Sequence, residues 1–300
     1  MAILQVENIT KSYGKELVLN NISFNIPYPK IVALVGPNGS GKTTLLNIIT
    51  NLLKPDSGNI QILGRPNTDP NIFYETSFMQ DNSVLYEYLT GYDHLQFIAD
   101  VQNLSKEQIL KTSQLVGNDG YLHKKVKNYS LGMKQHLLLA MAILNKPKLL
   151  ILDEPLNGLD PTSAIRVREL IIKLYKEGTT ILISSHNLGE IDRITSNIIF
   201  IKNGQIIEED LSEFEQVTYY LSVSNQQHAI KILKEQQIPV ILENERLKIW
   251  IAEKSLQTVI SVLLNQGISI KDIEKKVTGS EERYQQIFSK KDEVDETIEI

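Results

Sequence analysis

The chain of 300 residues contains no cysteine and no long apolar run. Without cysteine there can be no disulfide framework, and a reducing compartment is compatible with this composition. No apolar run reaches the roughly 18 residues that a membrane span needs. The first seven residues alternate like a strand and lack the pattern of a signal peptide. We therefore expect a soluble protein, whose role at a membrane would come through a partner.

The chain also lacks an excess of basic residues. It has 31 lysines and arginines against 36 acidic residues, a formal net charge of −5. Residues 290–300 hold five of the acids and two of the lysines, so the rest of the chain has a net charge of only −2. A nearly neutral body argues against broad nucleic-acid binding, and we expect no nucleic-acid partner. The acidic end is expected to be a solvated tail.

What the chain does contain is a glycine-rich loop in the setting that phosphate binding needs. Residues 31–35 predict a buried strand, and residues 45–49 predict the start of an amphipathic helix. The loop between them follows G-x-x-x-x-G-K-[ST], so its backbone N–H groups can surround a phosphate at the helix N-terminus. This setting disfavours the alternative of a plain glycine turn. The candidate residues are Gly36, Pro37, Asn38, Gly39, Ser40, Gly41, Lys42, Thr43 and Thr44.

Within this loop, we expect Lys42 to reach the terminal phosphates and the Thr43 hydroxyl to ligate Mg²⁺. A second signal lies further along, where the apolar strand predicted at 149–152 ends in Asp153 and Glu154. The carboxyl ends of strands face the ligand crevice of an open α/β sheet. Asp153 could hold Mg²⁺, and Glu154 could orient or deprotonate the water that attacks a γ-phosphate. The alternative is a solvated pair of acids at the end of a strand.

The order of predicted elements indicates two different parts. Up to about residue 210, strands alternate with helices, which indicates a parallel α/β core. Beyond residue 211 the predicted order is β-α-β-β-α-β, with helices at 226–236 and 254–266 and a last strand at 268–270. That order suggests a small α+β module of the ferredoxin-like type.

Between the loop and the acids lie residues 128–135, N-Y-S-L-G-M-K-Q, with Ser130 placed 23 positions before Asp153. Here the chain resembles the ATP-binding subunits of ABC transporters, whose signature is L-S-G-G-Q. The resemblance covers roughly residues 2–210, and several motifs occur in the family's order. It implies a P-loop NTPase core at 1–210 with a helical subdomain at about 85–145. An accessory domain at 211–289 and the acidic tail at 290–300 would follow.

The resemblance also implies roles for single residues. Tyr13 would stack on adenine, and Gln80 would touch Mg²⁺ and signal to the membrane subunit. Ser130 and Gly132 would bind the nucleotide, as would Asp160 in the D-loop, and His186 would contact the γ-phosphate. The implied cofactors are ATP and Mg²⁺. The catalytic set is Lys42, Glu154 and His186, and the metal set is Thr43, Gln80 and Asp153.

Some of these positions have simpler interpretations. Ser130 fits a helix N-cap, which is a structural role in itself. Tyr13 could be an exposed aromatic residue beside a turn, and Gln80 alone would be unremarkable. A last set of aromatic residues could line a docking groove for a helix of a membrane subunit or equally belong to the core. They are Phe78, Tyr86, Tyr88 and Tyr92.

The chain departs from the family pattern both within the signature and just after it. Leu131 replaces its first glycine, Met133 replaces its glutamine, and His136 stands where arginine is frequent. A leucine side chain limits how closely the backbone can approach a phosphate. The Leu-Gly-Met variant is similar to that of bacterial exporters of drugs and antimicrobial peptides and of self-immunity systems. Some peptide-immunity subunits have glutamate at the position of Gln80, so this residue weakens the narrower assignment.

The function that this resemblance implies is ATP hydrolysis coupled to export of a drug, peptide or related hydrophobic substrate. Two copies, or one copy and a related cassette subunit, would pair head to tail on the inner face of the membrane and drive a separate integral permease. The rival hypothesis is a soluble ABC-type ATPase that acts on ribosomes or DNA. The chain has one cassette, no sustained heptads and no basic patch, which favours the transporter.

Overall fold

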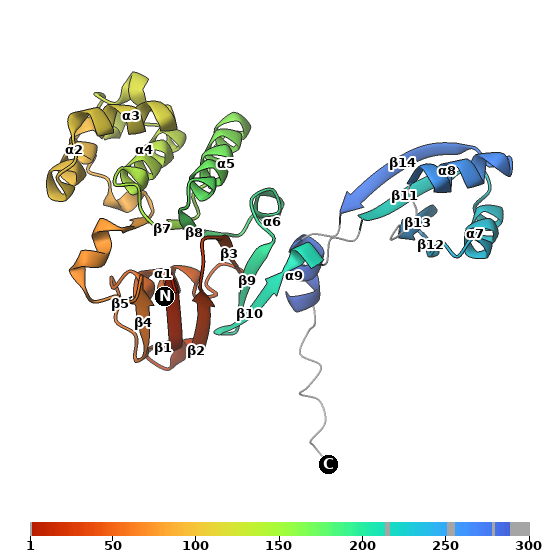
Figure 1. The fold of residues 1–300 in the computed structure, drawn as a ribbon, viewed down its shortest axis with the longest axis horizontal. Coiled ribbons are helices and arrows are strands. Elements are labelled where there is room, and N and C mark those ends of the chain that lie inside the picture. The colour runs from red at the N-terminus through yellow and green to blue at the C-terminus, as the bar shows by residue number, and fades with distance from the viewer. Residues whose placement is uncertain (1, 214–216, 251–255, 278–279, 289–300) are drawn as a thin grey trace, which may run out of the picture. The chain divides into compact units, whose positions relative to one another are not determined.

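The computed structural model describes residues 2–213, 217–250, 256–277 and 280–288 (Figure 1). Its contacts divide the chain into two compact units, Met1–Glu209 and Asp210–Ile300. The predicted acidic tail at 290–300 lies outside the described residues. Within the described ranges, no helix has the length and apolar character that crossing a membrane requires.

A six-stranded sheet lies at the centre of the first unit, in the order β10-β9-β3-β8-β7-β6. The pairs β3–β8, β3–β9, β7–β8 and β6–β7 are parallel. β3 and β8 are buried along their whole length, as expected for parallel strands covered on both faces. The strands are β3 Ile31–Val35, β6 Thr76–Met79, β7 Leu149–Asp153, β8 Thr180–Ser185, β9 Asn197–Lys202 and β10 Gln205–Asp210.

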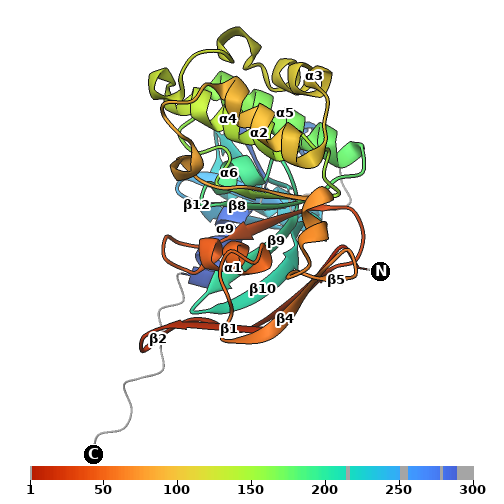
Figure 2. The same ribbon diagram turned by 90° about the vertical axis from the view of Figure 1, so that its left-hand side faces the viewer.

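The second sheet of this unit is antiparallel, in the order β2-β1-β4-β5. Helix α1 (Lys42–Ile49) lies between the two sheets (Figures 1 and 2). Leu45, Leu46, Ile48 and Ile49 are fully buried in one core cluster with residues of both sheets. This sandwiched position explains why α1 is apolar on most sides. The strands are β1 Leu4–Tyr13, β2 Glu16–Ile26, β4 Ser57–Ile62 and β5 Arg65–Pro66.

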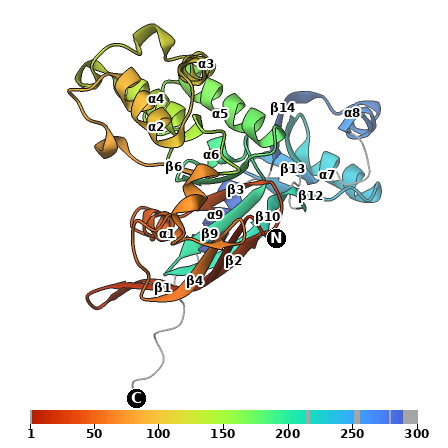
Figure 3. The same ribbon diagram turned by 60° about the vertical axis from the view of Figure 1, so that its left-hand side comes forward.

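The other α-helices of the first unit lie on the opposite side of the six-stranded sheet from α1 (Figures 1 and 3). Local signals set their ends: Thr90 forms a capping box at the start of α2, and Gly117 closes α3 in the left-handed region. The α-helices are α2 Gly91–Gln102, α3 Lys106–Val116, α4 Leu131–Ile143, α5 Pro161–Lys176 and α6 Leu188–Ile191. Short 3₁₀ helices are η1 Pro70–Tyr74, η2 Asn82–Val84, η3 Asp119–Tyr121 and η4 Val126–Asn128.

The second unit contains a four-stranded sheet in the order β12-β13-β11-β14, and each neighbouring pair is antiparallel. The element order β-α-β-β-α-β is that of ferredoxin-like modules, with α9 added at its end. The apolar faces of α7 and α8 pack with the sheet in a separate core. The elements are η5 Leu211–Glu213, β11 Val217–Val223, α7 Gln226–Glu235, β12 Val240–Glu243, β13 Arg246–Trp250, α8 Leu256–Asn265, β14 Ile270–Val277 and α9 Ser280–Phe288.

The last strand of this sheet differs from the sequence prediction, which placed it at residues 268–270. Ile268 instead closes α8, because its N–H donates to Leu263 O over 3.0 Å. β14 begins only at Ile270 and runs through a charged stretch that contains Lys271, Asp272 and Glu274. β14 is an edge strand, and charged residues are common there because they discourage pairing with other chains. The apolar alternation that marks a buried strand is therefore weak in this segment.

Candidate functional site

The glycine-rich loop connects β3 to the buried helix α1, as the sequence predicts. Gly39 and Gly41 have φ values of +80° and +99°, which favour glycine. A Cβ on Gly36 would lie 2.6 Å from both Ile201 Cγ2 and Ser40 Oγ, so a side chain at this position would collide with β9 and with the loop itself. The Ser40 hydroxyl oxygen is buried and has no hydrogen-bond partner in the described part of the chain. The loop is thus narrow and lined by polar groups, which suits a phosphate.

Lys42 is the one charged side chain of this loop, and it is 7% exposed. Its Nζ donates to Gly36 O over 2.8 Å and to Pro37 O over 3.2 Å, and lies 4.0 Å from Glu154 Oε1. Burial lowers the pKa of this ammonium group, while the carboxylates of Glu154 and Asp153 act in the opposite direction. A buried cation thus faces the acids across the loop.

The two acids at the end of β7 lie close to this loop. Thr43 Oγ1 donates to Asp153 Oδ2 over 2.9 Å, which joins the first turn of α1 to the strand end. Ser184, which pairs in register with Asp153, donates its hydroxyl to Asp153 Oδ1 over 2.5 Å. The same Ser184 oxygen accepts the N–H of Glu154 over 2.9 Å.

Ser184 was not among the residues that the sequence singled out as functional. The available signal in the sequence was its place directly after the apolar run 181–183, where a parallel strand would bring it beside the acids. Its side chain is completely buried, unlike those of the residues that it holds. We therefore count Ser184 as a site residue that positions Asp153 and Glu154.

Glu154 and His186 come together at the ends of β7 and β8. His186 Nδ1 lies 2.9 Å from Glu154 Oε2, and the His186 side chain is 49% exposed. Glu154 has a φ of +50°, a conformation that costs a residue with a side chain about 1 kcal/mol or more. This strained backbone turns the chain sharply after Asp153. Glu154 thereby lies between the imidazole of His186 and the ammonium group of Lys42.

These groups fit a nucleotide with a magnesium ion. The hydroxyl of Thr43 and the carboxylate of Asp153 are hard oxygen donors that already lie side by side. Among the described residues no group of three or more histidine, aspartate or glutamate side chains could hold a metal by itself. Mg²⁺ commonly binds through one or two protein oxygen ligands together with waters and the phosphates of a substrate. Thr43 and Asp153 would hold this ion.

Gln80 and Tyr13 were predicted to lie at the same site. Met79, the last residue of β6, pairs with Leu152. Gln80 directly follows β6 and Asp153 ends β7, so the two residues are neighbours at this sheet edge, and Gln80 is half-buried there. Tyr13 ends β1 and is 51% exposed, with Lys11 Nζ 5.8 Å from the centre of its ring. The exposed ring of Tyr13 is available for stacking on a base.

Ser130 and Asp160 each begin a helix. Ser130 caps α4 by accepting the N–H of Met133 over 3.2 Å. Asp160 caps α5 and accepts hydrogen bonds from the backbone of Thr162 and from both the backbone and the hydroxyl of Ser163. The hydroxyl of Ser163 is the largest cause that lowers the pKa of this carboxyl group. In the described residues, no hydrogen bond or ion pair joins either cap to Lys42.

The aromatic residues near Gln80 do not share one environment. Phe78 packs against the main core cluster. Tyr86 and Tyr88 are 58% and 67% exposed, and their ring centres lie 5.8 Å apart. Tyr92 is half-buried and donates its hydroxyl to Gln96. Of the four, the pair of Tyr86 and Tyr88 offers an open surface, whereas Phe78 is partly buried against the core.

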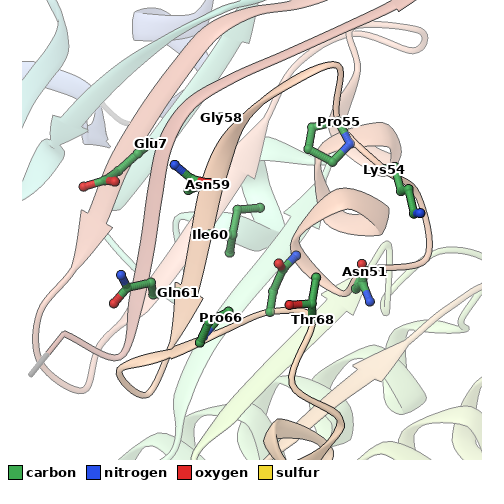
Figure 4. Close-up of a pocket in the computed structure, with 11 residues that line it drawn as sticks. Glu7, Asn51, Lys54, Pro55, Gly58, Asn59, Ile60, Gln61, Pro66 and Thr68 are labelled. Atoms are coloured by element: carbon green, nitrogen blue, oxygen red, sulfur yellow. The ribbon is translucent and has the colours of Figure 1, made fainter.

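A separate pocket of about 430 Å³ lies beside β4, away from the residues described so far (Figure 4). Its lining is mostly polar and exposed, including the amides of Asn51, Asn59 and Gln61 and the side chains of Glu7 and Lys54. None of the predicted nucleotide residues lines it. The candidate active site is therefore the cluster around Lys42, Asp153 and Glu154.

Comparison with known proteins agrees with this geometry. The family model described as ABC transporter matches residues 19–157. The lantibiotic transport ATP-binding protein SrtF of Streptococcus pyogenes is 42% identical over 207 residues, which cover 69% of this chain and 90% of the relative. The bacitracin transport ATP-binding protein BcrA of Enterococcus faecalis is 34% identical over 301 residues, which cover 96% of each chain.

A solved structure, the dimeric post-hydrolysis state of an ATP-binding cassette bound to ADP and Pi, is also similar. It has a TM-score of 0.64 and 26% sequence identity, and the match covers 69% of this chain and 98% of that one. The fold, the arrangement of the loop and acids, and these similarities agree with one another. The chain therefore belongs to the ABC transporter family and carries its ATP-binding domain.

Proposed function

We propose that this chain is the ATP-hydrolysing subunit that powers export of an antimicrobial peptide, a drug or a related hydrophobic molecule through a separate permease. The carrying observation is the placement of Glu154, 2.9 Å from His186 and 4.0 Å from Lys42. Similarity to the lantibiotic and bacitracin transport proteins supports this substrate class. It does not favour the alternative of an ATPase that acts on ribosomes or DNA.

In the proposed site, the loop at 36–44 holds the phosphates through its backbone N–H groups and the helix N-terminus. Lys42 contributes its ammonium group to the terminal phosphates, and Tyr13 stacks on the adenine. Thr43, Asp153 and Gln80 provide oxygen ligands for Mg²⁺, directly or through water. The bound ion supplies charge neutralisation on the phosphate oxygens.

For hydrolysis we propose that Glu154 accepts a proton from the attacking water while His186 donates a hydrogen bond to the γ-phosphate. The contact between His186 Nδ1 and Glu154 Oε2 would then orient the two groups toward the same point. Ser184 holds the backbone of Glu154 and the carboxylate of Asp153 in place. The protein thus contributes position and charge, which are the main terms in phosphoryl transfer.

A second cassette would complete each site. We propose a head-to-tail dimer in which Ser130 and Gly132 of one copy approach the phosphates bound by the other copy, with Asp160 nearby. Ser130 at the start of α4 is exposed and could present its hydroxyl to an anion at this helix N-terminus. The dimeric state of the similar ADP-bound cassette supports such pairing. ATP binding would then favour the closed dimer and hydrolysis would release it.

The permease would anchor the protein at the inner face of the membrane. We propose that the exposed pair of Tyr86 and Tyr88, close in sequence to Gln80, lies in its docking surface. Residues 211–289 would have an accessory role in regulating the ATPase, in dimerisation or in ligand binding. A chain cut after residue 215 that kept its ATPase rate, dimerisation and transport unchanged would remove all three roles.

The test uses the wild-type chain, Glu154→Gln, and Glu169→Gln as a matched control on the exposed side of α5. With Mg²⁺ and saturating ATP, we expect Glu154→Gln to elute as a stable dimer with little turnover, and the control to behave as wild type. We expect the tagged chain to co-purify with an integral permease from gently extracted membranes. Co-expression of the chain with this permease should make the host cells less susceptible to bacitracin or a lantibiotic, and Glu154→Gln should abolish this protection. A monomer under saturating ATP, or co-purification with ribosomes instead of a permease, would contradict the proposal.

A further inference from the structure

The start of α4 and the loop after Glu154 hold each other by two reciprocal contacts between a leucine and a glycine. A Cβ on Gly158 would overlap with Leu131 Cδ2 and lie 3.0 Å from Leu131 Cγ. In the other direction, a Cβ on Gly132 would lie 3.6 Å from Leu159 Cδ2. Each glycine is therefore covered by a leucine of the opposite segment. Leu131, which stands where the family has glycine, thus contacts Gly158 of the same chain.

The loop that Leu131 covers is short and tightly turned. The N–H of Asn157 donates to Glu154 O over 3.1 Å, and Asp160 is fixed by capping α5. On the other side, Glu154 follows directly from the buried strand β7. Because so few residues separate these fixed ends, a displacement at Gly158 must be absorbed by the backbone near Glu154. Gly158 has a φ of +73°, so another residue would not adopt its conformation easily.

Helix formation does not account for the Leu131 side chain. The helix already has its cap in Ser130, which accepts the N–H of Met133. Leu131 is 49% exposed, so it is not part of the buried core. The distinctive feature of this side chain is its contact with Gly158. Packing of this apolar side chain against the backbone of Gly158 also restricts the positions that the loop can take.

We propose that Leu131 is a positioning residue for hydrolysis. By covering Gly158 it fixes the loop at 154–160, and through this loop it holds the Glu154 carboxylate toward His186 and Lys42. Leu131 need not touch the nucleotide for this role. The inference rests on the proposed function, because it takes Glu154 as the group that accepts the proton from water. It means that Leu131, a residue of the helical subdomain, influences the rate of ATP hydrolysis at the site of its own chain.

The experiment compares Leu131→Ala, Gly158→Ala and the double variant with wild type. Leu115→Ala is the matched control, since Leu115 is 41% exposed on α3 and lies outside these contacts. Steady-state kinetics give kcat and the KM for ATP, and thermal unfolding of the nucleotide-free protein reports on the fold. In a Glu154→Gln background, ATP-dependent dimerisation reports whether the nucleotide still binds.

For Leu131→Ala we expect kcat to fall about tenfold through misplacement of the carboxylate, with an unchanged KM. Gly158→Ala should lower kcat further, because its methyl group collides with Leu131. Adding Leu131→Ala should then restore part of the activity of Gly158→Ala, since the collision is removed. The melting temperature of Leu131→Ala should stay near that of Leu115→Ala, and dimerisation should persist.

A wild-type kcat in Leu131→Ala would overturn the inference. A double variant whose kcat is only the product of the two single effects would also overturn it, since the two residues would then act independently. Should Gly158→Ala fail to fold, Leu131→Ala against Leu115→Ala still decides the question. Failure of the proposed function gives a different result, in which the wild-type chain itself does not hydrolyse ATP.

Discussion

Asp153 and Ser184 lie opposite each other near the ends of β7 and β8, and the Ser184 hydroxyl donates to Asp153 Oδ1 over 2.5 Å. The same oxygen accepts the N–H of Glu154. The buried Ser184 hydroxyl thus forms hydrogen bonds with the Asp153 carboxylate and the Glu154 backbone, at the point where the pairing of β7 with β8 ends. Ser184 therefore holds the Asp153 carboxylate and the Glu154 backbone from the neighbouring strand.

This relationship predicts the effect of Ser184→Ala. Removing the hydroxyl leaves the Glu154 N–H without its partner and takes one donor from Asp153, so we expect a loss of about 1–3 kcal/mol in the free energy of unfolding. We also expect kcat to fall about tenfold or more, because the acids are no longer held in position. Denaturant unfolding and steady-state ATPase assays measure the two effects.

The control for Ser184→Ala is Thr180→Val at the other end of β8. Thr180 is fully buried, and within the described residues its hydroxyl oxygen has no hydrogen-bond partner. Replacing it with the isosteric valine should therefore leave activity unchanged and stability equal or higher. Equal losses in the two variants would show that Ser184 contributes only as part of the strand.

The exposed contact of His186 leads to a different prediction. Its Nδ1 lies 2.9 Å from Glu154 Oε2, but half of the side chain is open to solvent. For His186→Ala we expect a fall in kcat of about 100-fold, typical of a lost acid–base or orienting group, with an unchanged melting temperature. His123→Ala, an exposed histidine of the same unit, should retain full activity. A His186→Ala variant with wild-type turnover would exclude a catalytic role.

Lys42 predicts a loss of nucleotide binding. Its buried ammonium group donates to Gly36 O and Pro37 O, so it is already placed at the mouth of the loop. For Lys42→Met we expect ATP affinity to weaken about 30-fold or more, as when one partner of a buried charged contact is removed. Titration with a fluorescent ATP analogue measures it. Lys54→Met, at the separate pocket of Figure 4, should bind as wild type. If Lys54→Met instead weakened ATP binding and Lys42→Met did not, the nucleotide would bind in that pocket.

The sequence predicted those parts of the site whose chemistry is local. The loop at 36–44 and the pair of Asp153 and Glu154 are each marked by a short pattern beside an apolar strand. Ser184 carries no such mark, because its role comes from the pairing register of β7 with β8, which joins residues 31 positions apart. The contact of Leu131 with Gly158 was missed for the same reason. It depends on how a helix start and a loop meet in space.

Helix-capping residues also differ in how readily they can be recognised from the sequence. The sequence predicted Ser130 both as a helix cap and as a nucleotide contact, and its hydrogen bond to Met133 confirms the cap. Asp160 was singled out only through the family resemblance, yet it makes the same kind of hydrogen bonds at the start of α5. Cap residues are recognisable when a helix is predicted to begin directly after them. No helix was predicted to begin directly after Asp160, so this cap was not recognised from the sequence.

His136 predicts how stability depends on pH. It is 8% exposed in α4, with Nδ1 3.1 Å from the hydroxyl of Tyr121. Burial raises the pKa of Tyr121 to about 12, so this hydroxyl keeps its proton. The His136 Nε2 atom is buried and has no hydrogen-bond partner in the described part of the chain. Burial is the largest cause that lowers the pKa of His136, Arg166 lowers it further, and Asp160 acts in the opposite direction.

A lowered pKa means that the folded state binds a proton at His136 less readily than the unfolded state does. As the pH falls through the ordinary histidine range, near 6.5, the unfolded state gains protons first, and the free energy of unfolding decreases. The contribution is fully present above that range and is lost on the acid side, with a slope of at most about 1.4 kcal/mol per pH unit.

For His136→Gln we expect the free energy of unfolding to depend less steeply on pH between pH 7 and pH 5. Denaturant unfolding at several pH values measures it, and His123→Gln, at an exposed histidine, should follow the wild-type curve. Parallel curves for His136→Gln and wild type would mean that other groups cause the acid destabilisation.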